Sequence, residues 1–101
     1  MGPEPKSKSK LSEVMPLREF KAIQLAMLAK LEDELLEKYP NRREQVKNIV
    51  ERLRKKTIAL RRWNVLDYVA TIYELSDLFP ELKQLIPPKE AIEKLYGVKY
   101  E

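Results

Sequence analysis

Hydrophobic residues recur every three or four positions along most of the chain, a spacing typical of amphipathic helices. β-branched residues never alternate with polar ones over the length of a strand. The pattern predicts helices over residues 16–39, 41–62 and 65–79, a short helical turn in 80–86, and a final helix from about 88. We therefore expect an all-α fold, a small bundle of three to four main helices plus a short C-terminal helix.

The first predicted helix is apolar over an unusually wide arc. Its main stripe comprises Phe20, Ile23, Met27, Leu31 and Leu35, and further apolar residues flank this stripe at positions 17, 25, 28, 36 and 39. A helix that is apolar well beyond one seam is covered on more than one side. We expect it to be the central element of the core, or to bind a protein partner or a second copy of the chain with part of this surface.

The second predicted helix carries most of the positive charge. Residues 41–62 contain nine Lys or Arg and only two Glu, whereas the whole chain has a net charge of +4. At about 100° per residue, one stripe is apolar and contains Val46, Val50, Leu53, Thr57 and Leu60, with Ile49 at its edge. A neighbouring arc of about 120° is basic and contains Arg43, Lys47, Arg54, Lys55, Arg61 and Arg62. That arc is expected to stay in water when the apolar stripe packs.

The ends of this helix carry sequence signals of their own. Asn41 and Glu44 have the spacing of a reciprocal N-terminal cap. Near Trp63 and Asn64 the apolar stripe loses its phase, and Asn64 with Asp67 repeats the capping spacing. We expect a kink or short turn there. Because neither helix contains Gly or Pro, one long helix is the alternative.

The third predicted helix has the opposite charge to the second. It carries Asp67, Glu74 and Asp77, and no Lys or Arg follows Arg62 until Lys83. A basic helix packed beside an acidic one is often stabilised by internal charge pairing. The cations of the second helix are therefore available to a ligand only if these acidic side chains do not neutralise them.

The first fourteen residues lack apolar periodicity, and a Lys-Ser alternation places Lys6, Lys8 and Lys10 close together. We expect residues 1–14 to be a flexible basic tail and residues 15–101 to be a single helical domain. The tail either solubilises the protein or becomes ordered on phosphates or on a partner. It lacks the apolar stretch of a secretion signal, and no run of about 18 apolar residues occurs. We expect a cytoplasmic protein that does not span a membrane.

The composition offers few groups for catalysis. There is no His and no Cys, and the two Gly are at positions 2 and 97. This excludes imidazole and thiol chemistry, the usual zinc ligands and a Gly-rich phosphate loop. One acidic cluster would suit a divalent cation, although a solvated face is the simpler interpretation; it contains Glu32, Asp33, Glu34 and Glu37. We expect no enzyme activity, no cofactor and no metal.

These observations favour a non-catalytic protein that contacts nucleic-acid phosphates without sequence specificity, as an accessory subunit of a nucleoprotein complex. The six cations of the basic arc would make the contact, and the three Lys of the tail would form an adjacent arm. Trp63 would stack on an exposed base, although a lone Trp between helices more commonly packs in the core. The alternative is a helical adaptor that binds a protein and touches neither DNA nor RNA.

Overall fold

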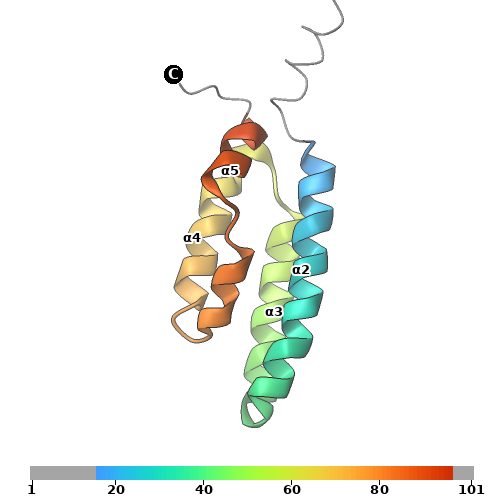
Figure 1. Cartoon of the computed structure of the whole chain (residues 1–101), viewed down its shortest axis with the longest axis vertical. Coiled ribbons are helices and arrows are strands. Elements are labelled where there is room, and N and C mark those ends of the chain that lie inside the picture. The colour runs from blue at the N-terminus through green and yellow to red at the C-terminus, as the bar shows by residue number, and fades with distance from the viewer. Residues whose placement is uncertain (1–15, 97–101) are drawn as a thin grey trace, which may run out of the picture.

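The computed structural model describes residues 16–96, which form a bundle of helices (Figure 1). Its α-helices are α2 (Leu17–Lys38), α3 (Arg43–Ile58), α4 (Val65–Leu75) and α5 (Lys89–Tyr96). Its 3-10 helices are η1 (Pro40–Arg42), η2 (Arg62–Asn64) and η3 (Pro80–Leu85). No strand occurs in residues 16–96, and the all-α fold is confirmed. The predicted basic tail, with its three Lys, lies outside the described residues.

The helices are arranged as two adjacent pairs. Helices α2 and α3 lie side by side and antiparallel, joined by the tight turn of η1 (Figure 1). Helix α4 pairs with η3, and η3 contacts both α2 and α4. Helix α5 lies near the end of the molecule where α4 begins, and it contacts η2. Helix α3 thus belongs to the α2–α3 pair, and α4 belongs to the α4–η3 pair.

The core confirms the apolar stripe predicted for α3 and corrects the one predicted for α2. All five stripe residues of residues 41–62 and the neighbouring Ile49 are buried, including Leu60, which follows the end of α3. In α2, however, Ile23 is 54% exposed and Met27 is only half-buried. The buried face of α2 is rotated relative to the prediction and contains Phe20, Gln24, Leu28, Leu31 and Leu35.

A buried chain of hydrogen bonds explains why a polar residue lies in this face. Gln24 Nε2 donates to the Tyr68 hydroxyl at 2.9 Å and to the Leu85 carbonyl at 2.8 Å. The Thr57 hydroxyl donates to the Leu53 carbonyl at 2.7 Å and lies 3.2 Å from the Tyr68 hydroxyl. Because Thr57 has a single hydroxyl proton, the Tyr68 hydroxyl donates to Thr57. The chain connects α2, α3, α4 and η3 at the centre of the bundle.

The predicted turn between the second and third helices is confirmed, and it begins earlier than expected. Helix α3 ends at Ile58, so a single long helix is excluded. Asn64 Oδ1 accepts a hydrogen bond from the Arg61 backbone N–H at 2.8 Å, and Asn64 Nδ2 lies 3.4 Å from the Ala59 carbonyl. The first bond caps η2 at its N-cap residue Arg61, and the second contact reaches a carbonyl at the end of α3. Asn64 takes the predicted N-cap position of α4 but makes no capping bond to that helix, because its side-chain oxygen accepts from the Arg61 backbone N–H instead.

The predicted Asn41–Glu44 cap of α3 is also wrong. Asn41 lies inside η1, so its backbone does not take the N-cap position, which Arg42 occupies without a side-chain capping bond. The Arg42 guanidinium carbon lies 4.4 Å from the Phe79 ring centroid and 5.4 Å from that of Tyr39. Cation–π contacts of this kind stabilise the turn where a capping side chain was expected.

Candidate nucleic-acid interface

The outer face of α3 carries exposed cations that form no ion pair within residues 16–96. Arg43, Lys47 and Lys55 are exposed, and none of them forms an ion pair with a residue in the range 16–96. At 1.5 Å per residue, Arg43 and Lys55 are about 18 Å apart along the helix axis. Arg61, just beyond the end of α3, is also exposed and has no ion pair with a described residue. We call these four residues the basic ridge.

Two of the six predicted cations are half-buried and engaged with other residues of the protein, and the exposed Arg61 also donates from its guanidinium to the Leu60 carbonyl at 2.8 Å. Arg54 lies 2.5 Å from Glu51 and 3.7 Å from Glu32 of α2. The half-buried Arg62 donates from its guanidinium to the Leu95 carbonyl of α5. Arg54 keeps part of its side chain in water, and exposed pairs of this type contribute little to stability. Arg62, in contrast, serves to hold η2 against α5.

Trp63 lies in water rather than in the core. Its side chain is 78% exposed, whereas Leu60 and Val65 on either side are fully buried. The alternative that Trp63 packs in the core is therefore wrong. Trp63 follows Arg61, the last residue of the basic ridge, by two positions in the chain, so an exposed indole ring occurs in the turn that the ridge leads into.

The acidic residues in α4 and in the turn after it form no ion pair with the ridge. Within the described part of the chain, the ion pair that joins α3 to α4 is that of Lys56 with Asp67, at 3.1 Å. Glu74 and Asp77 are exposed and form no ion pair with residues 16–96. Charge pairing between α3 and α4 thus uses Lys56, a cation that was not part of the predicted site.

One exposed cation of α3 was missed by the prediction. Arg52 is exposed and lies about 60° from Lys55 around the helix. It falls outside the arc that the sequence pattern defined, because that arc was drawn next to the apolar stripe on one side only. The exposed positive surface of α3 is therefore wider than predicted, although Glu44 and Glu51 interrupt it.

A separate ionic cluster joins the end of α2 to η3. Glu81 Oε2 accepts hydrogen bonds from Lys38 Nζ at 2.7 Å and from the Tyr39 hydroxyl at 2.9 Å. The bond from Lys38 lowers the pKa of Glu81, and the same contacts with Glu81 raise the pKa values of Lys38 and Tyr39. All three shifts move the pKa away from neutrality. The cluster is suited to fixing η3 in place rather than to proton transfer near pH 7.

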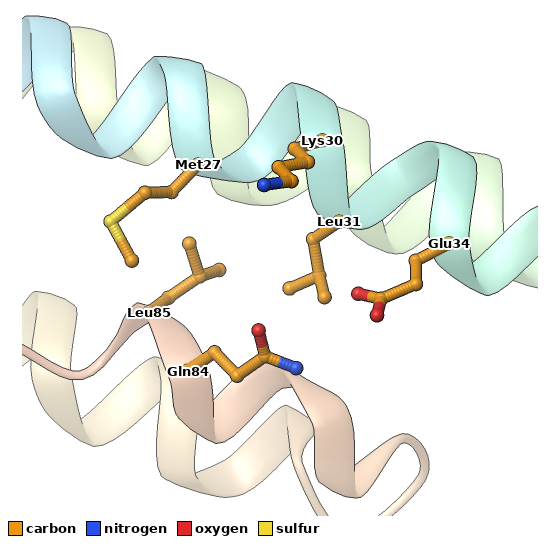
Figure 2. Close-up of a pocket in the computed structure, with 6 residues that line it drawn as sticks. All are labelled: Met27, Lys30, Leu31, Glu34, Gln84 and Leu85. Carbon is orange, nitrogen blue, oxygen red and sulfur yellow. The ribbon is translucent and has the colours of Figure 1, made fainter.

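Two grooves flank α2, and neither is basic. Figure 2 shows the larger, of about 310 Å³ between α2 and η3, where Lys30 and Glu34 bring opposite charges to one rim. The smaller, of about 210 Å³, has an apolar lining that includes Phe20, Ile23, Met27, Pro87 and Ala91. In residues 16–96 no group of three or more acidic side chains is placed to hold a metal ion. The acidic cluster of α2 thus has no metal-site geometry.

No protein-family model matches the chain, and comparison with curated proteins and with solved structures finds no significant match either. None of the helices in residues 16–96 has both the length and the apolar character needed to cross a bilayer. Function must therefore follow from the geometry and charge of the described surface.

Proposed function

We propose that the protein binds nucleic acid through the phosphate backbone, without sequence specificity, and that it acts as a non-catalytic accessory subunit of a nucleoprotein complex. The basic ridge is the observation that carries this proposal. When exposed, unpaired cations of a protein contact phosphates, the small cations condensed on the nucleic acid are released. The entropy of this release drives binding to any sequence. A cation that is already paired with a carboxylate contributes much less binding free energy when it contacts a phosphate.

The dimensions of the ridge fit a nucleic-acid strand. The span of about 18 Å from Arg43 to Lys55 matches about five phosphates of one strand at about 3.4 Å each. Four phosphate contacts give a slope of about −3.6 on duplex DNA and about −2.8 on a single strand for the logarithm of affinity against the logarithm of salt concentration. A fourfold rise in salt should therefore weaken binding about 150-fold on duplex and about 50-fold on a single strand. Binding of this strength is expected to be micromolar at low salt.

Trp63 extends the proposed interface toward unpaired bases. An indole ring that is exposed beside a cation provides a stacking surface, and stacking does not depend on base identity. The proposal also assigns Lys6, Lys8 and Lys10 to an arm that contacts neighbouring phosphates. These three residues lie outside the described residues, so their contribution rests on the sequence alone.

A charge-reversal experiment tests the proposal. Fluorescence anisotropy would follow labelled strands and duplexes of DNA and RNA, about 20 nucleotides long, from about 25 to about 200 mM salt. The test variant combines Arg43→Glu, Lys47→Glu and Lys55→Glu. The control variant makes the same change in net charge at exposed cations elsewhere, and combines Arg18→Glu, Lys83→Glu and Lys94→Glu.

The ridge variant is expected to lose most of the binding and most of the salt dependence, because one of its four contacts remains. The control variant should bind nearly as the wild type does. Equal losses in both variants would show that net charge alone drives binding. Absence of wild-type binding at the lowest salt concentration would overturn the proposal.

One observation favours the second candidate function, a helical adaptor that contacts a protein and no nucleic acid. The exposed Ile23 of α2 borders the apolar groove of about 210 Å³. An apolar groove beside an exposed aliphatic residue suits a protein ligand better than a phosphate. This function predicts no salt-sensitive binding in the wild-type titration, so the same experiment separates the two candidates. The prediction that a partner or a second copy docks through α2 belongs to this candidate.

A further inference from the structure

The three side chains of η2 are directed to three different surroundings. A 3-10 helix turns by about 120° per residue, so neighbouring side chains diverge. The half-buried Arg62 reaches α5, where its guanidinium donates to the Leu95 carbonyl. Trp63 projects into water with 78% of its side chain exposed, and Asn64 accepts a bond from the Arg61 backbone N–H. The exposed indole is therefore presented by a turn whose other two side chains are engaged with the protein.

The contact from Arg62 caps the last turn of α5. Helix α5 ends at Tyr96, so the Leu95 carbonyl is one of the last four, which lack a partner within the helix. A guanidinium at this end satisfies that carbonyl and interacts favourably with the partial negative charge of the helix C-terminus. The Leu95 side chain is fully buried. Arg62 is thus attached to a residue that is itself anchored in the core.

Helix α5 and the turn around η2 support one another. Of the described elements, η2 is the one that α5 contacts most, at the end of the molecule where α4 begins (Figure 1). Leu60 before the turn and Val65 after it are fully buried, so the turn is anchored at both sides. The contact of Arg62 with α5 adds a third attachment, at the residue next to Trp63.

We propose that Arg62 is a positioning residue of the candidate interface: by capping α5 it fixes η2, and so holds Trp63 in the orientation in which a base stacks on it. Helix α5 then supports single-strand binding although it lies outside the basic ridge. This role rests on the proposed function, because stacking on Trp63 is part of that function. It differs from the role that the sequence pattern predicts for Arg62, which is direct contact with phosphate.

The expected loss of affinity is smaller than that from removing the indole. A side chain that is held in place before binding does not have to be ordered on binding, and such ordering costs a factor of about 2 to 12 in affinity. Loss of the capping contact should weaken single-strand binding by about this factor. Duplex binding should stay nearly unchanged, because a duplex offers no unpaired base. The salt slope should also stay unchanged, whereas loss of a direct phosphate contact would lower it by about 0.7 on a single strand.

Three variants of the full chain test this role. Arg62→Met keeps an unbranched side chain and removes both the charge and the donors, whereas Arg62→Lys keeps the charge and a donor. Lys94→Gln is the matched control, because it removes one exposed positive charge from α5 itself. Circular dichroism would verify that each variant folds. The measurements are the NMR order parameter of the Trp63 backbone amide without nucleic acid, and the affinity for single strand and duplex at several salt concentrations.

Without nucleic acid, the order parameter of Trp63 should be about 0.85 in the wild type, in Lys94→Gln and in Arg62→Lys. It should fall toward about 0.6 in Arg62→Met. Single-strand affinity should fall in Arg62→Met alone, with the salt slope of the wild type. Glu93→Pro tests the role of α5 from the other side, because Pro breaks the helix and leaves Arg62 in place. It should lower the order parameter of Trp63 in the same way.

An order parameter that neither Arg62→Met nor Glu93→Pro changes would overturn the inference. A reduced salt slope in Arg62→Met, with equal losses on single strand and duplex, would also overturn it and would identify Arg62 as a direct phosphate contact. Failure of the wild type to bind any nucleic acid would overturn the proposed function instead. The order parameter, which is measured without ligand, would still decide whether Arg62 and α5 hold the turn.

Discussion

Tyr68→Phe isolates the buried hydrogen-bond chain that joins the helices. The substitution keeps the aromatic ring, which is 3% exposed, and removes only the hydroxyl group. That hydroxyl accepts from Gln24 Nε2 at 2.9 Å and lies 3.2 Å from the Thr57 hydroxyl. After the change, Gln24 keeps its bond to the Leu85 carbonyl but has one buried N–H without an acceptor. Thr57 keeps its bond to the Leu53 carbonyl and loses an incoming donor.

The expected cost follows from these losses. Leaving a buried polar group unsatisfied costs about 1–3 kcal/mol, and one amide proton is left in this state. We therefore expect the free energy of unfolding to fall by about 2 kcal/mol. For a domain of this size, 1 kcal/mol corresponds to about 4–8 °C, so Tm should fall by about 8–16 °C.

Urea unfolding followed by circular dichroism measures this change, and low protein concentration avoids any contribution from association. Tyr73→Phe is the matched control, because Tyr73 lies in the same helix with its ring 54% exposed. The control should stay within about 0.5 kcal/mol of the wild type. Equal stability of the two variants would refute the assignment of Tyr68 to a structural hydrogen-bond chain.

Two further predictions concern the ionic cluster and the exposed indole. The bond from Lys38 lowers the pKa of Glu81 below its ordinary value of 4.5, so Glu81 stabilises the fold above that value. This contribution is lost as the pH falls through the lowered pKa. The urea midpoint of the wild type should therefore fall more steeply below pH 4.5 than that of Glu81→Gln, and parallel curves would contradict this. Trp63→Ala should weaken single-strand binding about 5- to 150-fold, from about 1–3 kcal/mol of stacking, with little effect on duplex. Anisotropy titrations measure both, and an equal loss on duplex would exclude stacking.

Helix positions followed from the sequence because burial in a helix repeats with the helical period. The stripe of α3 is apolar throughout apart from Thr57, and periodicity alone identified it. The buried face of α2 was misassigned because Gln24 lies within it. Its hydrogen-bond partners Tyr68 and Leu85 are 44 and 61 residues away, so no local pattern reveals that Gln24 is buried.

The sequence predicted where the candidate site lies, but not which residues make it up. The concentration of Lys and Arg in residues 41–62 marked the basic helix directly. Which cations remain unpaired depends on tertiary contacts, such as that of Arg54 with Glu32 and that of Arg62 with the Leu95 carbonyl. Trp63 lies at the outside of the turn, because Leu60 before it and Val65 after it are the residues that are buried in the core. These features could be identified only from the three-dimensional structure.

The central claim, that the basic ridge is the surface that meets phosphate, is tested most directly by NMR. Amide chemical shifts of the ¹⁵N-labelled protein would be followed during titration with a short single-stranded oligonucleotide at low salt. We predict that the largest changes cluster at Arg43, Lys47, Lys55 and residues 61–63, and that added salt reverses them. Changes centred on α2 or on the acidic end of α4, or no changes at all, would contradict the account.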